Sequence, residues 1–466
     1  MKIIILGAGQ VGRTAAYHLA REEANDVTVV DTDDELLRDL QDRIDIRTVA
    51  GNASSPRTLT QAGAESADMI VAMTNSDEVN IVACQVAWTL FGTRTKIARI
   101  RSREYTTRRE LLVSTELTPT EPPARPGPQG FAVDMFVSPE ELVTSYIERL
   151  IRYPGALQVL DFANGHVRLV GLRALKGGLL VGQQLRTLRE HLPNVEARII
   201  AIYRNGRSIK PDGDTTIESG DEVFFLAATK DIRRVMSEIR RLEDPARSVV
   251  IAGGGNIGLR LAQELEEGNQ VKLIERDPQR ARRISEQLRN TIVLVGDAAD
   301  EELLVEENID SADTFVALTN SEEANILSAM LAKRLGCTKV MALITKPAYA
   351  DLMESGPIDI AISPQTVTMG SLLAYVRRGD IEQVHSLRRG AAEAMEAIAH
   401  GSPGGPVVGR RVEEIPLPEG VTIGATVRGD EVIMAHHDTI VQANDHVILF
   451  LSDRRQIAAV GKLFQT

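Results

Sequence analysis

Short apolar runs alternate with longer stretches of helical periodicity in two separate parts of the chain. Most positions in these runs are Val, Ile, Leu or Ala, as expected of strands buried on both faces of a parallel sheet. Helices between such strands indicate doubly wound α/β modules. The expected strands are residues 2–6, 27–31, 46–50, 68–73 and 96–100 in the first module, and 249–252, 271–275, 291–295, 313–318 and 338–344 in the second.

The second half of the chain repeats the first. The segment Gly51-Asn52-Ala53 matches Gly296-Asp297-Ala298, and residues 73–80 match residues 318–325 at the same offset. A smaller, β-rich module follows each α/β module, since residues 181–185 match 408–412 and residues 220–226 match 444–450. A repeated order of landmarks indicates a duplicated unit.

Each small module is preceded by a helix that begins with Ser-Pro, at residues 138 and 363. Ser138, Pro139 and Glu141 form a predicted capping box. The apolar side of the helix from 139 either belongs to the core of its own module or is that of a crossover helix, which leaves the sheet and packs on a partner. We therefore expect two Rossmann-like α/β domains at 1–137 (with a Pro-rich loop at 114–132) and 231–362, each followed by a crossover helix and a small α+β domain, at 138–230 and 363–466.

A glycine motif follows the first strand of each α/β module. It reads Gly7-Ala8-Gly9-Gln10-Val11-Gly12 in the first module and Gly253-Gly254-Gly255-Asn256-Ile257-Gly258 in the second. Glycine lets the backbone turn tightly and approach a pyrophosphate, and the helix that follows offers free N–H groups to the anion. Both motifs are therefore candidate phosphate-binding turns.

An acidic residue ends the second strand of each module, Asp31 in the first and Glu275 in the second. Asp31 follows Gly12 at nearly the spacing expected of a carboxylate that binds a ribose diol. Such a carboxylate repels a 2′-phosphate, and neither Thr32 nor Asp33 supplies an arginine to offset it. We therefore expect NAD or ATP/ADP in preference to NADP.

Further candidates follow the later strands, at the carboxyl edge where such sheets bind ligands. Thr74 and Asn75 could instead cap the helix expected at 77–91. The candidates after the third and fourth strands are Asn52, Ala53, Thr74 and Asn75, with Asp297, Thr319 and Asn320 in register in the second module.

Two arginines are ambiguous. Arg99, in the fifth strand, could reach a phosphate or be an ordinary surface residue, and Arg276 could stack on adenine or lie in solvent. Aligning Lys96 with Lys339 places Ala342 opposite Arg99. On that alignment the second site lacks the cation, so we expect it to prefer a less charged ligand or to bind more weakly.

The composition argues against several classes of protein. A net charge of −12 disfavours a nucleic-acid partner. Apolar runs fall short of the ~18 residues that a membrane-spanning helix needs. Cys84 and Cys337 lack metal-ligand spacing and are expected to be buried thiols. We therefore expect a soluble, cytoplasmic protein.

The whole arrangement resembles the TrkA family of Trk-system potassium uptake regulators, in which two RCK units follow one another. The segments that carry the resemblance are residues 153–158, 220–225, 253–258, 271–277, 325–332 and 385–390. The resemblance implies a regulatory subunit at the cytoplasmic face of a TrkH-like potassium-translocating membrane subunit. It also implies a homotetrameric ring that gates uptake in response to NAD(H), with ATP and ADP as alternative ligands.

A dehydrogenase would need an acid–base group beside its nicotinamide. None of the eight histidines lies in a motif aimed at the expected cleft, and the sequence shows no Ser/His/Asp arrangement and no metal cluster. These features favour a sensor that is not an enzyme. The alternatives are an NAD-dependent oxidoreductase and an RCK-type regulator of another cation channel or exchanger.

Overall fold

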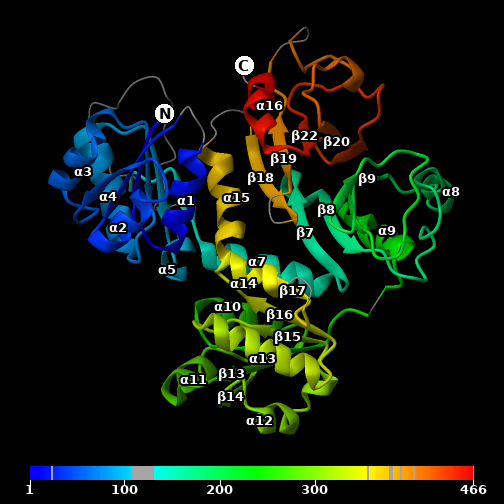
Figure 1. The fold of residues 1–466 in the computed structure, drawn as a ribbon, viewed down its shortest axis with the longest axis horizontal. Helices are drawn as coiled ribbons and strands as arrows, with labels where there is room; N and C mark the ends of the chain where they lie inside the picture. The colour runs from blue at the N-terminus through cyan, green and yellow to red at the C-terminus, as the bar shows by residue number, and fades with distance from the viewer. Residues whose placement is uncertain are drawn as a thin grey trace. The chain divides into compact units, whose positions relative to one another are not determined.

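The computed structural model describes residues 1–21, 25–107, 131–242, 244–353, 356–376, 381–388, 391–401 and 405–464. These residues form two compact units, 1–142 and 143–466 (Figure 1). The Pro-rich loop expected at 114–132 lies outside the described residues as far as position 130.

The first unit is built on a six-stranded parallel sheet in the order β3-β2-β1-β4-β5-β6. The strand order reverses beside β1, which confirms the predicted doubly wound sheet. The three-residue strand β6 was not predicted. The strands are β1 (Lys2–Leu6), β2 (Asp26–Asp31), β3 (Arg47–Ala50), β4 (Met69–Ala72), β5 (Thr95–Arg99) and β6 (Met135–Val137), and the helices are α1 (Gln10–Ala20), α2 (Asp34–Gln41), α3 (Pro56–Ala62), α4 (Asp77–Phe91) and α5 (Arg103–Thr106).

The second unit contains a sheet of the same topology, β14-β13-β12-β15-β16-β17. Its sixth strand, β17, was also missed by the pattern analysis. The strands are β12 (Ser248–Ala252), β13 (Gln270–Glu275), β14 (Ile292–Val295), β15 (Thr314–Ala317), β16 (Lys339–Leu343) and β17 (Ile360–Ile362), and the helices are α10 (Asn256–Leu265), α11 (Pro278–Ser285), α12 (Glu301–Glu306), α13 (Glu322–Arg334) and α14 (Pro347–Met353).

Two five-stranded antiparallel sheets complete the second unit, in the matching orders β10-β9-β11-β8-β7 and β21-β20-β22-β19-β18. Their strands are β7 (Ala156–Phe162), β8 (Val167–Arg173), β9 (Ala197–Arg204), β10 (Arg207–Ile209), β11 (Glu222–Ala228), β18 (Ile381–Leu387), β19 (Ala392–Ile398), β20 (Val421–Arg428), β21 (Glu431–Met434) and β22 (His446–Leu451), with helices α8 (Leu188–His191), α9 (Ile232–Ile239) and α16 (Ile457–Phe464).

The two small sheets bury their apolar faces in one shared cluster. Phe224 and Leu226 of the first sheet lie in this cluster with Ile448 and Phe450 of the second. A Cβ atom on Gly424 of β20 would lie 2.3 Å from a methyl carbon of Leu226. The glycine therefore allows a close approach between the sheets.

An ion pair between a partly exposed arginine and a buried aspartate occupies the same place in each small sheet. Arg204 donates from Nε and Nη2 to Asp221, both at 2.9 Å, and Arg428 donates in the same way to Asp445 at 2.9 and 2.8 Å. Both carboxylates also accept a turn N–H. This geometry identifies the two aspartates as structural residues.

Helix α7 (Pro139–Arg152) begins in the first unit and continues in the second. Ser138 Oγ accepts a hydrogen bond from Glu141 N, as expected of an N-cap. Val143, Ile147 and Leu150 are fully buried in the core of the second unit. This core contains residues of the small module that follows α7, such as Val159 and Val170, as well as residues of the second α/β module. Helix α15 (Pro364–Val376) has the matching position in the sequence repeat.

The glycine turns permit close backbone contacts that no other residue would allow. A Cβ atom on Gly12 would lie 1.9 Å from Gly7 O, and one on Gly258 would lie 2.0 Å from Gly253 O. The first glycine of each turn has a positive φ, 107° at Gly7 and 105° at Gly253. These contacts place the start of α1 and α10 directly against the preceding strand.

We predict that Gly258→Ala lowers the free energy of unfolding of the full chain by about 3 kcal/mol, because the methyl group overlaps Gly253 O. Gly255→Ala is the matched control, since a Cβ atom there would meet no atom within 4 Å and its φ is −72°. Urea denaturation measures both. Equal losses of stability in the two variants would contradict the packing argument.

Candidate functional site

The predicted ribose carboxylates lie directly against the glycine turns. Asp31 Oδ2 accepts a hydrogen bond from Ala8 N at 2.5 Å, and Glu275 Oε2 accepts one from Gly254 N at 2.9 Å. The second oxygen of each carboxylate accepts the N–H two residues further on, in Asp33 and Asp277. Because a carboxylate offers about four acceptor positions, both groups can still accept hydroxyl donors.

The remaining residues of the two glycine motifs contribute in different ways. Gly9 and Gln10 are exposed at the start of α1, and their counterparts Gly255 and Asn256 begin α10. The side chain of Val11 is buried in the core, so only its backbone can face a ligand. Ile257 is likewise partly buried against the core of its unit. The predicted phosphate contacts at these positions are therefore backbone N–H groups.

In the second unit, most of the predicted residues line one cleft of about 240 Å³. The cleft brings the glycine turn together with the carboxyl ends of four strands, as expected at a topological switch point. Seven predicted residues line it: Gly253, Gly255, Glu275, Arg276, Asp297, Thr319 and Asn320. Gly254, Asn256, Ile257 and Gly258 do not line it, and Ala298, next to Asp297, does.

A buried asparagine fixes the ends of the fourth and fifth strands in each module. Asn80 Oδ1 accepts from Thr74 N and Oγ1 at 2.9 and 2.7 Å, and its Nδ2 donates to Arg99 O at 2.9 Å. Asn325 makes the same three contacts, with Thr319 at 2.8 and 2.7 Å and with Leu343 O at 3.0 Å. Both asparagines are fully buried.

This arrangement corrects the helix-cap alternative for Thr74 and Asn75. The cap of α4 is Ser76, whose Oγ accepts from Val79 N at 3.2 Å. The hydroxyl of Thr74 contacts Asn80, while Asn75 is exposed at the edge of the sheet. Asn52 accepts hydrogen bonds from Ser54, and Ala53 is buried beside it.

The alignment that placed Ala342 opposite Arg99 is wrong by one residue. Ala98 pairs with Ala72, and Ala342 pairs with Ala317 at the equivalent place in the second sheet. The residues that follow are Arg99 and Leu343, and the Asn80 and Asn325 hydrogen bonds match them as well. Leu343 carries no charge, so the second module still lacks the cation.

The second cleft nevertheless contains two arginines. Arg276 is exposed at its edge, and Arg280 Nη1 lies 4.0 Å from Glu275 Oε2. Arg280 was missed by sequence reasoning, because nothing in the glycine motif points to the first turn of α11. The expectation of weaker binding at the second site therefore rests only on the replacement of Arg99 by the uncharged Leu343. The positive charges of Arg276 and Arg280 argue against it.

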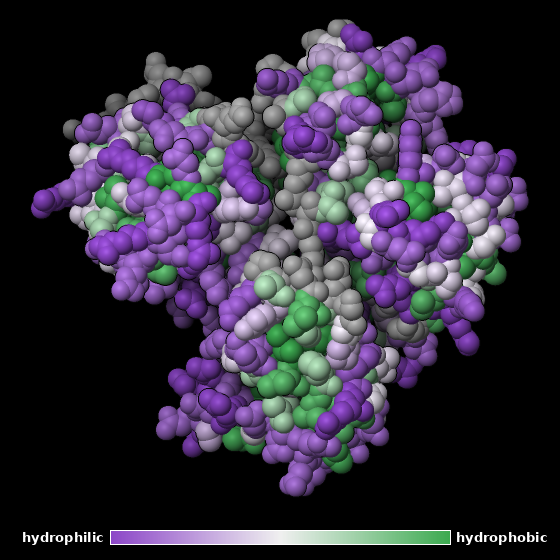
Figure 2. All heavy atoms as spheres, in the orientation of Figure 1, coloured by the Kyte–Doolittle hydropathy of each residue, from purple (hydrophilic) through white to green (hydrophobic). Residues whose placement is uncertain are grey.

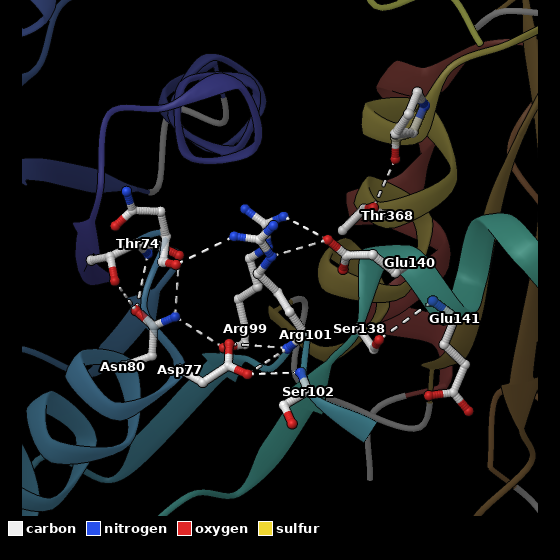
Figure 3. A network of polar contacts seen from close by, with 12 residues as sticks. Thr74, Asp77, Asn80, Arg99, Arg101, Ser102, Ser138, Glu140, Glu141 and Thr368 are labelled. Carbon is white, nitrogen blue, oxygen red and sulfur yellow. Dashed lines mark hydrogen bonds and ion pairs between the residues drawn. The ribbon is translucent and has the colours of Figure 1, made fainter. Parts of the chain in front are cut away.

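Sequence reasoning also missed Arg101 and Glu140 in the first unit, which Figure 3 shows together with Arg99. Arg99 Nη2 lies 3.1 Å from Glu140 Oε1, and Arg101 Nε lies 3.3 Å from the same oxygen. Arg101 Nη1 also donates to Asn75 O at 3.3 Å. Arg99 is therefore ion-paired and only 18% exposed, which corrects the alternative of an ordinary surface arginine.

The described part of the chain holds no group of three or more His, Cys, Asp or Glu side chains that could bind a metal ion. Among the same residues, no helix has the length and apolarity needed to cross a membrane. Cys84 and Cys337 are buried free thiols, and burial raises their pKa to about 12 and about 11. Both thiols are therefore protonated at neutral pH.

A buried carboxylate at the start of α13 anchors the loop that follows the fifth strand. Glu322 Oε1 accepts from Lys346 N at 2.6 Å and from Thr345 N. Burial raises the pKa of Glu322, but these hydrogen bonds outweigh burial and hold the pKa below its ordinary value of 4.5. Because the pKa is lower in the folded state, Glu322 stabilises the fold above about pH 4.5 and loses this effect as the pH falls through its folded pKa.

We predict that Glu322→Gln lowers the free energy of unfolding by about 1 kcal/mol at pH 7, because neutral hydrogen bonds replace charge-assisted ones. The difference from the wild type should shrink towards zero at pH 3, as measured by urea denaturation. Glu306→Gln, at an exposed position of α12, is the control and should have little effect at either pH. An equal loss for Glu322→Gln at both pH values would show that its charge is not involved.

Comparison with known proteins agrees with this architecture. Residues 3–114 and 249–364 match the TrkA-N domain, and residues 169–240 and 402–465 match the TrkA-C domain. The crystal structure of the GsuK RCK domain (TM-score 0.61, 18% identity, 99% of this chain and 94% of that chain) and a solved structure of the GsuK channel bound to NAD (TM-score 0.60, 17% identity, 99% and 78%) share the fold.

Full-length relatives are closer in sequence. The Trk system potassium uptake protein TrkA of Halomonas elongata is 58% identical over 466 residues, which cover 100% of this chain and 99% of the relative. Those of Vibrio alginolyticus and Haemophilus influenzae are 56% and 48% identical over the same shares of each chain. The resemblance seen in the sequence is thereby confirmed: the chain belongs to the TrkA family of Trk-system potassium uptake proteins.

Proposed function

We propose that this chain is a regulatory subunit of a Trk-type potassium uptake system, that it senses nucleotides and that it is not an enzyme. The observation that carries the proposal is the pair of glycine turns, each with a carboxylate held against it, in a chain whose full length matches potassium uptake proteins. The family match favours this function over the dehydrogenase and over a regulator of another channel.

The proposed ligands are NAD(H) and, as alternatives, ATP or ADP. Each carboxylate, Asp31 or Glu275, would accept hydrogen bonds from a ribose diol, and backbone N–H groups at the start of each following helix would bind phosphate. Arg99 and Arg101 would add positive charge beside the first site, and Arg276 and Arg280 beside the second. The fold shared with a GsuK channel that binds NAD supports a dinucleotide as one ligand.

The proposed partner is a TrkH-like membrane subunit, which places the chain in the cytoplasm at the inner face of the membrane. We further propose that the chain assembles as a homotetramer. Apolar side chains gather on the face of the second unit where α13 lies (Figure 2). Leu327 on α13 is 60% exposed and Val82, at the same place on α4, is 46% exposed. Exposed apolar helix faces repeated in both modules are suited to contacts between copies of the chain.

Regulation would proceed by a shift between conformations of this assembly. A ligand can shift that equilibrium only by binding one conformation more tightly than the other. Two sites in each chain, and several chains in a ring, would make the response to nucleotide concentration cooperative.

Potassium flux into proteoliposomes that contain the Trk membrane subunit tests the proposal. Adding the chain should make flux depend on ATP or NADH, with a change of about fivefold or more between ligands. The double variant Asp31→Asn, Glu275→Gln should bind the membrane subunit but lose most of the nucleotide dependence. Flux that is the same with and without the chain, at every nucleotide concentration, would contradict the proposed function.

A further inference from the structure

Two guanidinium groups in the first unit converge on one carboxylate oxygen (Figure 3). The oxygen is Glu140 Oε1, and the groups belong to Arg99 and Arg101. The Glu140 side chain is 10% exposed and that of Arg99 18%, so solvent screens this pair less than a surface ion pair. Arg99 Nε is also buried, and no described residue accepts its hydrogen.

The internal repeat shows that the fold does not require these charges. Asp77 accepts from Arg101 N and Ser102 N, as Glu322 accepts from the two residues that follow Ile344. By this match Arg101 corresponds to Thr345, while Arg99 corresponds to Leu343.

The third charge is also absent from the second module. The Ser-Pro sequence before each crossover helix aligns Glu140 with Gln365. The second module therefore builds the same strand ends and the same helix start with all three charges replaced by uncharged residues. All three charges are confined to the first module, which points to a role that belongs to this module alone.

The cluster formed by Arg99, Arg101 and Glu140 borders the first candidate site. Arg101 Nη1 donates to the carbonyl oxygen of Asn75, and Asn320, the counterpart of Asn75, lines the cleft in the second unit. Guanidinium groups bind carboxylates and phosphates with the same planar fork of donors. The Glu140 carboxylate therefore holds the position on the two arginines that an anionic group of a ligand would need.

We propose that Glu140 is an internal competitor for the anionic end of the ligand in the first module. A nucleoside triphosphate carries more negative charge than a dinucleotide, so it displaces the carboxylate more readily and takes over the two arginines. Glu140 thus sets the discrimination between these ligand classes at the first site. This inference rests on the nucleotide-sensing function proposed above.

Displacement of Glu140 also has a structural consequence. Glu140 lies in the first turn of α7, and the residues of this helix beyond position 142 belong to the second unit. Losing the ion pairs releases the start of this helix from the first unit. A triphosphate in the first module would thereby act on the helix that joins the two units.

The test is equilibrium binding of ATP and of NADH to the full chain by calorimetry at low ionic strength. Glu140→Gln removes the competing charge while keeping the size of the side chain. We expect one of the two ATP sites to bind about tenfold more tightly, with a change of less than about threefold for NADH. The matched control is Gln365→Glu, which introduces a carboxylate where the arginines are absent and should leave both affinities unchanged.

A second variant separates competition from a merely structural role of Glu140. In the background of Arg101→Ala, the gain in ATP affinity from Glu140→Gln should largely disappear, while thermal unfolding should report the same folded chain. ATP affinity that is unchanged or weakened in a folded Glu140→Gln chain would overturn the inference and leave the proposed function standing. A wild-type chain that binds neither nucleotide would overturn the proposed function itself.

Discussion

The close contact between the first and last glycines of each turn is the constraint on which the site depends. It leaves no room for a side chain at Gly12 or Gly258. It also brings the start of a helix into direct contact with the turn that ends the preceding strand. The helix N–H groups and the neighbouring carboxylate then face the same small region. This packing therefore places N–H donors for an anion next to a carboxylate that can accept hydroxyl groups. The same arrangement occurs twice in the chain.

Duplication supplies an internal reference that separates structure from function. What both modules retain supports the fold: the glycine turns, the buried asparagines Asn80 and Asn325 and the serine caps of α4 and α13. The two modules differ in the charged residues around the candidate sites. These are Arg99, Arg101 and Glu140 in the first module and Arg276 and Arg280 in the second. The two sites therefore share a frame but present different charges to a ligand.

Much of the fold was readable from the sequence because its signals are local. Apolar runs located ten of the twelve parallel strands, and glycine spacing located both turns. The three-residue strands β6 and β17 were not predicted, because a run of three residues is too short to show a hydrophobic periodicity. The contact between Arg101 and Glu140 was not predicted, because the two residues are 39 positions apart in the sequence. They come together only when the end of β5 and the start of α7 are folded. Asn80 and Asn325 were present in the matched repeat, but spacing alone did not show that they are buried.

The alignment error at Arg99 has the same origin. A lysine match in sequence suggested Ala342, whereas strand register and a side-chain hydrogen bond select Leu343. Register is set by which backbone atoms pair, and a sequence comparison does not contain that information.

A crystal structure of the full chain soaked with NADH or ATP tests the central claim most directly. The account predicts a nucleotide in both glycine clefts, with ribose hydroxyls on Asp31 and Glu275. Clefts that stay empty at saturating nucleotide, with the carboxylates still bound only to their own turns, would contradict it.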